Sequence, residues 1–214
     1  MSKNLEQAKK RLFAALRSEI PKSRALDAIE KVSRELFVPE ASRHLSYEDI
    51  PLPIGEGQTI SQPYIVAIMT HALDVHRDDK VLELGTGSGY QAAILSLLAR
   101  KVYSMERVAS LADKARELLA SLGYDNVEVR LVGDELGCTE EAPFDVIIVT
   151  AASPSLPHVL LGQLAQGGRM VIPVGSQQEQ WLVKVIKTDG GYSISSLGSC
   201  RFVPLVGKGA WQEG

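Results

Sequence analysis

Short β-rich runs alternate with helical segments after Asp79, and this alternation limits the fold more than any other feature of the chain. The predicted strands cover 81–84, 102–105, 127–132, 144–149, 170–174, 181–187 and 192–204, with helices ending near 100 and covering 108–122 and 157–164. Parallel strands need long crossover connections, usually helices, and right-handed crossovers place those helices on both faces of the sheet. The alternation therefore predicts an α/β fold with a doubly wound, mostly parallel sheet of seven strands.

Both ends of the chain depart from this alternation. The last two predicted strands adjoin through Asp189, Gly190 and Gly191, a hairpin signal that predicts an antiparallel edge at the C-terminal end of the sheet. The segment 51–63 contains three prolines and two glycines, which predicts an irregular loop, and a helix is predicted over 63–73. Two earlier amphipathic helices are predicted from apolar residues at helical spacing, which are Leu5, Ala8, Leu12 and Leu16, then Leu26, Ile29, Val32 and Leu36.

Charge and cysteine content narrow the classes of function. The 23 Lys and Arg residues face 26 Asp and Glu residues, so the net charge of −3 supplies no positive field, and we expect no nucleic-acid partner. Cys138 and Cys200 lie far apart without CxxC spacing, which indicates no disulfide framework or zinc site and fits a reducing compartment. No apolar run has the length of a signal peptide or a membrane span, so we expect a cytoplasmic protein without membrane association.

The most informative motif is VLELGTGSGY at Val81–Tyr90. Its glycines form G-x-G-x-G between a predicted strand and a predicted helix, which lets a ligand approach the backbone closely at the helix N-terminus. The alternative is a glycine-rich turn that binds nothing. The dinucleotide fingerprint fails because Tyr90 stands where the third glycine would be, and this favours a nucleotide-type ligand without a diphosphate.

Acidic residues follow the next two predicted strands. Glu106 ends the second strand, where a carboxylate can accept hydrogen bonds from both ribose hydroxyls, although it could also be only a favourable charge at a helix N-terminus. Asp134 follows the third strand and could contact an adenine amino group, although alone it is more typical of a turn. Together with the glycines, these acids predict an adenosine-sized pocket at the switch point of the sheet.

These motifs resemble the class I methyltransferases that use S-adenosylmethionine, whose fold is Rossmann-like. Within that superfamily the chain closely resembles the protein-L-isoaspartate O-methyltransferase family over nearly its whole length. The segments that carry the resemblance are ELFVPE at 35–40, LPIGEGQTISQPYIVAIMT at 52–70, VLELGTGSGYQAAIL at 81–95, APFDVIIVTAA at 142–152, GGRMVIPVG at 167–175 and RFVPL at 201–205. The QTIS segment at 58–61 is far more specific to this family than the glycine loop is.

The resemblance implies an enzyme that methylates the α-carboxylate of isoaspartyl residues in damaged proteins, with S-adenosylmethionine as cofactor and S-adenosylhomocysteine as product. The ester then cyclises to a succinimide, which starts repair. A carboxyl group with a pKa near 4 is already ionised at neutral pH, so no general base is needed. Consistently, the four histidines show no metal-ligand spacing, and no HExxH or G-x-S-x-G motif occurs.

The resemblance also implies the functional residues. Ser61 would be catalytic and would orient the acceptor carboxylate, although by position alone it could be only a cap for the helix that starts near Pro63. Residues 1–75 would form a helical extension with the substrate loop and 76–214 a cofactor-binding core, together one domain, acting as a monomer. The implied cofactor-binding residues are Gln58, Thr59, Ile60, Glu83, Gly85, Thr86, Gly87, Ser88, Gly89, Glu106, Arg107, Asp134 and Glu135.

Two segments depart from the family pattern. The segment 133–138 is one residue shorter and has Glu135 where the family has glycine, so the adenine side of the pocket is expected to be reshaped. The tail after Leu205 matches weakly, and no functional residue is assigned there. Two rival functions remain open at this point: a related methyltransferase acting on a small molecule or nucleic acid, and a non-catalytic domain that binds S-adenosylmethionine and a protein partner.

Overall fold

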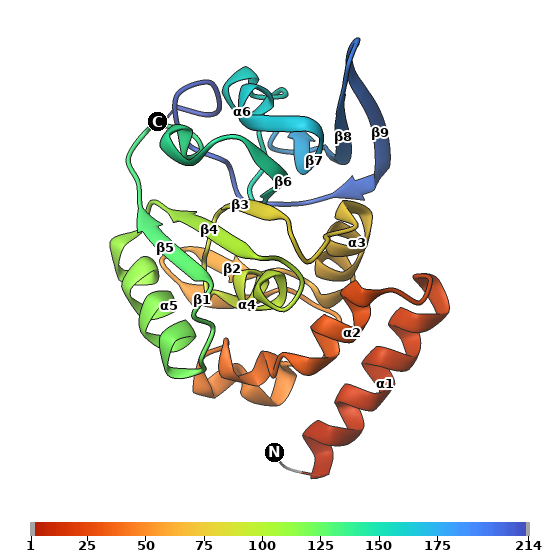
Figure 1. The fold of residues 1–214 in the computed structure, drawn as a ribbon. Helices are drawn as coiled ribbons and strands as arrows, with labels where there is room; N and C mark the ends of the chain where they lie inside the picture. The colour runs from red at the N-terminus through yellow and green to blue at the C-terminus, as the bar shows by residue number, and fades with distance from the viewer. Residues whose placement is uncertain (1–2, 213–214) are drawn as a thin grey trace.

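The structure is a computed structural model that describes residues 3–212, and its centre is a seven-stranded sheet (Figure 1). The strand order is β5-β4-β3-β6-β7-β8-β9, with parallel pairing from β5 through β7 and antiparallel pairing between β7, β8 and β9. The strands are β3 (Lys80–Leu84), β4 (Lys101–Glu106), β5 (Val127–Leu131), β6 (Phe144–Val149), β7 (Leu164–Gly175), β8 (Gln180–Thr188) and β9 (Gly191–Cys200). The predicted α/β fold with a mostly parallel sheet and an antiparallel C-terminal edge is confirmed.

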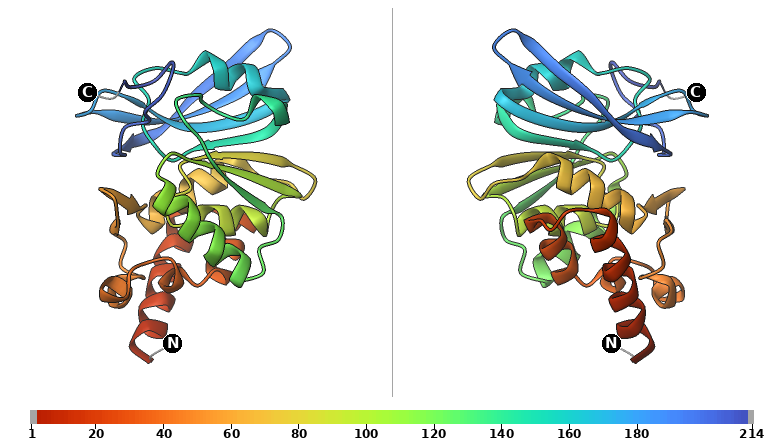
Figure 2. Two further views of the ribbon diagram at one scale, coloured as in Figure 1. Left: turned by 90° about the vertical axis from the view of Figure 1, so that its left-hand side faces the viewer. Right: turned by 90° about the vertical axis from the view of Figure 1, so that its right-hand side faces the viewer.

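Helices cover both faces of the sheet, as Figure 2 shows from two sides. Successive residues of a strand point to opposite faces, so Val81 and Leu82 are both fully buried but belong to different apolar clusters. The first cluster includes residues of the N-terminal helices and the second includes residues of α6. The helices are α1 (Lys3–Glu19), α2 (Arg24–Lys31), α3 (Pro63–Leu73), α4 (Tyr90–Ser96), α5 (Ala109–Ser121) and α6 (His158–Gln163), with short 3-10 turns η1 (Arg34–Leu36), η2 (Glu40–Leu45) and η3 (Thr139–Glu141).

The second predicted helix ends earlier than its apolar spacing indicates. Val32 closes α2 with an extended backbone, at φ −82° and ψ 120°. The chain then turns, so that Phe37 is buried and Leu36 is 42% exposed. The expectation that Leu36 lies on the buried face of that helix is therefore wrong, because the helical period stops at Val32.

The segment predicted as an irregular loop contains a small antiparallel hairpin, β1 (Leu52–Gly55) and β2 (Gln58–Ile60). Gly55, Glu56 and Gly57 all have positive φ, at 97°, 53° and 69°, which lets the chain reverse within three residues. The buried side chains of Leu52 and Ile60 face each other in register at the open end. The loop prediction is wrong here because this turn allows pairing despite the prolines.

Two strand boundaries differ from the predictions by more than one residue. β7 begins at Leu164 instead of 170, and β9 ends at Cys200 instead of 204.

Arg169 of β7 connects α3 to the sheet, because its side chain donates hydrogen bonds to the carbonyl oxygens of Leu73 and Asp74 at 2.7 Å each.

Among the helices in 3–212, none has the length and apolarity needed to cross a membrane.

Candidate active site

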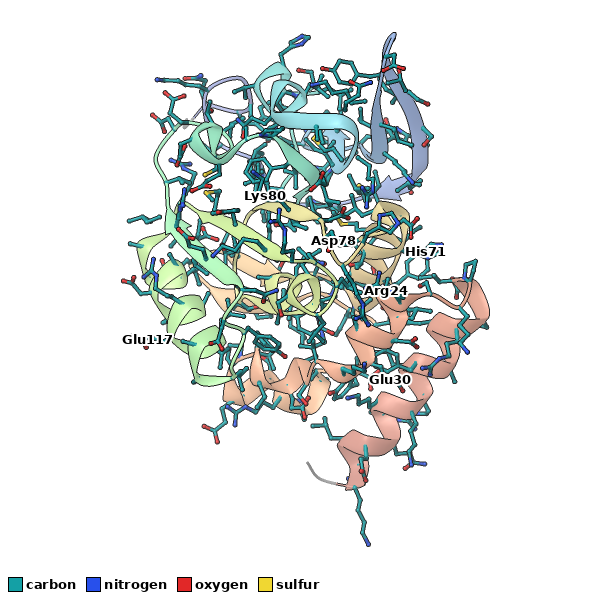
Figure 3. All side chains as sticks on the ribbon, in the orientation of Figure 1. Arg24, Glu30, His71, Asp78, Lys80 and Glu117 are labelled. Atoms are coloured by element: carbon teal, nitrogen blue, oxygen red, sulfur yellow. The ribbon has the colours of Figure 1, made fainter. Side chains whose placement is uncertain are left out.

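The glycine loop follows β3 and leads into α4. Gly85, Gly87 and Gly89 have φ angles of 94°, 53° and 85°, a region that side chains other than glycine rarely adopt. A Cβ on Gly85 would lie 2.3 Å from the Thr150 hydroxyl oxygen, so no side chain fits there. Lys80, which Figure 3 labels, is the first residue of β3. The loop begins after Leu84 and therefore lies at the other, C-terminal end of that strand. The loop therefore lies at the sheet edge where ligands of such folds bind.

The Glu106 carboxylate is held beside this loop by backbone N–H groups. Its Oε2 accepts from Gly87 N at 2.8 Å, and its Oε1 accepts from Arg107 N at 2.9 Å and Val108 N at 3.0 Å. The side chain is 8% exposed. A carboxylate offers about four acceptor positions, so one on Oε2 stays available for a ligand hydroxyl.

A cavity with about 840 Å³ of empty space, including open solvent at its mouth, lies over this edge; we call it the larger cavity. Apolar residues such as Val108, Val132 and Leu136 form part of its wall, and the Glu106 carboxylate lies at the same cavity. This combination fits a nucleoside, with an apolar wall for the base and an acceptor for the ribose hydroxyls. The predicted residues that line it are Gln58, Thr59, Gly85, Gly87, Glu106, Arg107 and Glu135.

A second cavity, called the smaller cavity below, adjoins the larger one and has about 430 Å³ of empty space, again including open solvent at its mouth. Four residues line both cavities: Thr59, Gly85, Gly87 and Thr150. The predicted residues that line only the smaller cavity are Ile60, Ser61, Thr86 and Ser88. The two spaces thus meet at the glycine loop; Glu106 lines only the larger cavity and Ser61 only the smaller one.

The structure does not use Ser61 as a helix cap. The N-cap residue of α3 is Gln62, and its side chain makes no capping hydrogen bond. Asp49 fills this role instead, since its carboxylate accepts from Tyr64 N at 2.8 Å and from Gln62 Nε2 at 2.9 Å. Among the described residues, no hydrogen bond involves the half-buried Ser61 hydroxyl, so it can interact with a ligand in the smaller cavity.

Glu83, a predicted cofactor residue, lines neither cavity and lies fully buried in β3. The Ser104 hydroxyl donates to Glu83 Oε2 at 2.5 Å and lies 2.6 Å from the Thr86 hydroxyl, so these three side chains support the glycine loop from within the sheet. Burial raises the pKa of Glu83 to about 8; the hydrogen bond from Ser104 opposes this rise, and the charge of Glu106 adds to it. Gly89 also lies outside both cavities and is the N-cap residue of α4.

The remaining predicted residues connect the 133–137 loop with the C-terminal tail. Asp134 lies outside the larger cavity; its carboxylate forms an ion pair with Arg107 at 3.7 Å, and its carbonyl accepts from Lys208 N at 2.8 Å. Glu135 lines the larger cavity and pairs with the Lys208 side chain. The tail therefore binds the loop that forms one wall of the larger cavity.

Sequence reasoning missed several residues that line the site, among them the apolar wall of the larger cavity at Val108, Val132 and Leu136. The segment 203–206 also lines the larger cavity; 203–205 belong to the RFVPL segment, to which no site role was assigned, and Val206 begins the weakly matching tail. Thr150, directly after β6, lines both cavities. The signal for Thr150 was available, because carboxyl ends of adjacent parallel strands meet at one sheet edge and β6 neighbours β3. Within 3–212, no group of three or more His, Cys, Asp or Glu side chains could hold a metal ion.

Comparison with known proteins agrees with this geometry. The family described as Protein-L-isoaspartate(D-aspartate) O-methyltransferase (PCMT) matches residues 6–210. A protein-L-isoaspartate O-methyltransferase of Methanoculleus marisnigri is 55% identical over 190 residues, 88% of this chain and 86% of its own. A solved protein-L-isoaspartate O-methyltransferase structure is 27% identical with a TM-score of 0.83, covering 94% of this chain and 67% of that one. A Plasmodium falciparum structure, described as a candidate for the same enzyme in complex with S-adenosyl-L-homocysteine, is 25% identical with a TM-score of 0.78, covering 91% and 96%.

Proposed function

The chain belongs to the protein-L-isoaspartate(D-aspartate) O-methyltransferase family, and from this premise we propose that it methylates the α-carboxylate of isoaspartyl residues at the junction of its two cavities. The enzyme is an S-adenosylmethionine-dependent methyltransferase. The observation that supports the proposal most strongly is that Ser61 and Glu106 line separate cavities that share the glycine loop. One cavity can then hold the methyl donor while the other holds the acceptor.

The larger cavity is the proposed donor site. S-adenosylmethionine, when bound, supplies a methyl group on a positively charged sulfur, which makes the methyl carbon electrophilic. Glu106 would accept a hydrogen bond from the ribose on its remaining Oε2 position, and Val132 and Leu136 would contact the base. The absence of a side chain at Gly87 leaves room for close approach of the donor to the backbone, whereas the space beside Gly85 is filled by the Thr150 hydroxyl.

The smaller cavity is the proposed acceptor site. The Ser61 hydroxyl would donate a hydrogen bond to one oxygen of the isoaspartyl carboxylate and so orient the other oxygen toward the junction. That oxygen would form the new bond to the methyl carbon while the carbon–sulfur bond breaks and its electron pair stays on sulfur. Because the acceptor is already ionised, the contribution of the protein is orientation and exclusion of water.

The methylated product continues to react without the enzyme. The backbone nitrogen that follows the isoaspartyl residue attacks the ester carbonyl, loses its proton, and expels methanol to give a succinimide. Water then opens the succinimide at either carbonyl, so part of the product is a normal aspartyl residue. Repeated methylation of the isoaspartyl fraction would convert damaged chains progressively.

Methyl transfer to a matched pair of peptides tests the proposal. The purified protein is incubated with S-adenosylmethionine labelled in its methyl group and with peptides that differ only in an isoaspartyl or an aspartyl residue. We expect label in the isoaspartyl peptide alone, released as methanol in mild alkali. Equal labelling of both peptides would refute the proposed acceptor. No labelling of either peptide, with S-adenosylhomocysteine still bound, would favour a different substrate or a non-catalytic binding domain.

We further propose that the enzyme acts as a monomer in the cytoplasm, without nucleic acid. The net charge of −3 argues against a nucleic-acid partner, and the unpaired Cys138 and Cys200 fit a reducing compartment. Light scattering coupled to size-exclusion chromatography would test the monomeric state. A mass near 23.2 kDa is expected, and a stable mass of twice that value would contradict it.

A further inference from the structure

Thr150 lies at the junction between the larger and smaller cavities and has no role in the site as described so far. It follows β6, which pairs in parallel with β3, and the two strands lie side by side in Figure 1. Of the four residues that line both cavities, Gly85 and Gly87 have no side chain and Thr59 is exposed on the hairpin. Thr150 is the half-buried side chain at this point.

The Thr150 hydroxyl is directed at the backbone of the glycine loop. Its Oγ1 lies 2.9 Å from the carbonyl oxygen of Leu84 and 2.8 Å from that of Gly85, so a single proton is shared between two acceptors. The backbone N–H of Thr150 also donates to Leu84 O at 2.9 Å. The residue directly after β6 therefore holds the end of β3 and the first peptide of the loop.

The Gly85 peptide is fixed from the opposite side as well. Its N–H donates to Met105 O of β4 at 2.9 Å, and Thr86 N donates to the same oxygen at 3.3 Å. The Thr150 oxygen also occupies the space where a Gly85 Cβ would lie. Met105 of β4 and Thr150 after β6 thus hold Gly85 from both sides by hydrogen bonds, and Gly85 lines both cavities.

We propose that Thr150 is a positioning residue for methyl transfer: its hydroxyl fixes the Gly85 peptide at the junction and thereby sets the alignment of donor methyl and acceptor carboxylate. This inference rests on the proposed function. Because its only proton is donated to the loop carbonyls, Thr150 cannot also donate to the acceptor carboxylate, which leaves that role to Ser61. Thr150 therefore affects the reaction through the loop.

Loss of alignment predicts a specific kinetic pattern. Thr150→Val keeps the shape of the side chain but removes the hydroxyl, whereas Thr150→Ser keeps the hydroxyl. A misplacement of about 1 Å at a reacting centre can cost about 100-fold in rate, and a loop that stays bonded to β4 should move less. We expect Thr150→Val to lower kcat about tenfold, with KM for the peptide and Kd for S-adenosylhomocysteine each within about threefold of wild type, and Thr150→Ser to retain most of kcat.

The experiment combines steady-state kinetics on the isoaspartyl peptide, calorimetric titration with S-adenosylhomocysteine and thermal unfolding of the ligand-free protein. Thr188→Val is the matched control, since it makes the same change at an exposed residue that ends β8. If Thr150→Val does not fold, the pair Thr150→Ala and Thr150→Ser replaces it, because these side chains differ only in the hydroxyl. The proposal then expects the alanine variant to be slow and the serine variant to be active.

Each alternative role gives a different result. A kcat within twofold of wild type in a folded variant without the hydroxyl would overturn the proposal. An unchanged kcat with weaker S-adenosylhomocysteine binding would also overturn it, because Thr150 would then act only in donor binding. A lower Tm with unchanged kcat would mean a purely structural role. Wild type must methylate the peptide in the same assay, so a failure of wild type counts against the proposed function rather than against Thr150.

Discussion

Replacing Glu106 by glutamine should weaken cofactor binding through two separate losses. The carboxylate accepts from three backbone N–H groups and keeps one acceptor position for the ribose. Glutamine has one acceptor oxygen and one NH2 donor. If the oxygen stays on the N–H groups of Arg107 and Val108, the NH2 group faces the N–H of Gly87, and two donors meet. The same NH2 group also replaces the ribose acceptor.

The magnitude follows from the number of charge-assisted bonds that are lost. A hydrogen bond to a charged group contributes about 1.5–3 kcal/mol. Loss of the ribose bond, together with a loosened Gly87, should therefore weaken S-adenosylhomocysteine binding by about 2–3 kcal/mol, or about 30- to 150-fold in Kd. The ligand-free protein loses the charge-assisted Gly87 bond, about 1.5–3 kcal/mol, and its Tm should fall by about 3–12 °C.

Calorimetric titration with S-adenosylhomocysteine measures the binding loss, and thermal unfolding of the ligand-free protein measures the stability loss. Glu117→Gln is the control for removing one negative charge, because Glu117 is exposed on α5 (Figure 3) and lines neither cavity. Unchanged affinity in a folded Glu106→Gln variant would refute the assignment of the larger cavity to the donor. If Glu106→Gln lost no more affinity than Glu117→Gln, Glu106 would contribute to binding only through its negative charge and not through hydrogen bonds.

Variants at three further residues test other parts of the site. Ser61→Ala should lower turnover at least tenfold with little change in S-adenosylhomocysteine affinity or Tm, and Ser61→Thr should fold well yet turn over slowly; wild-type rates in both would remove Ser61 from the mechanism. Gly87→Val should weaken S-adenosylhomocysteine binding more than Gly87→Ala, because a branched side chain is strained at φ 53°; wild-type binding by both folded variants would show that the ligand does not approach this loop. The pKa of Glu83 is about 8 in the folded protein against a usual 4.5, so the folded protein binds this proton more tightly than the unfolded chain does. The contribution of the protonated Glu83 to the free energy of unfolding is therefore complete below about pH 4.5 and is lost as pH rises through about 8. Glu83→Gln should therefore gain Tm relative to wild type between pH 6 and pH 9, and a constant difference in Tm would contradict a buried neutral carboxyl.

The sequence predicts most of the sheet because its strand signals are local. Val81 and Leu82 face opposite sides of a doubly covered sheet, so each central strand reads as a short continuous apolar run. Gly85 and Glu106 are predictable for a related reason. They lie at the carboxyl ends of β3 and β4, which pair in parallel. Because consecutive strands of β-α-β units have their carboxyl ends at the same sheet edge, the order of elements along the chain is enough to predict that they lie close together.

Two of the features that the sequence left open or missed depend on contacts between distant residues, and a third depends on a local backbone angle. Thr150 bonds Leu84 across 66 positions, and nothing near Thr150 in the sequence indicates the orientation of its hydroxyl. The role of Ser61 was open because serine often caps helices, and only the structure shows that Asp49 accepts the N–H group of Tyr64 instead. The 52–60 hairpin was missed because its turn needs positive φ at Glu56, which residue type alone does not predict.

The central claim is that donor and acceptor meet at the junction of the two cavities, and a crystal structure of the protein with S-adenosylhomocysteine and an isoaspartyl peptide tests it most directly. The account predicts the sulfur beside the residues that line both cavities, with the ribose at Glu106. It also predicts the Ser61 hydroxyl within about 2.5–3.0 Å of one oxygen of the isoaspartyl carboxylate. A sulfur directed away from Gly85 and Thr150, or a carboxylate bound outside the smaller cavity, would contradict the account.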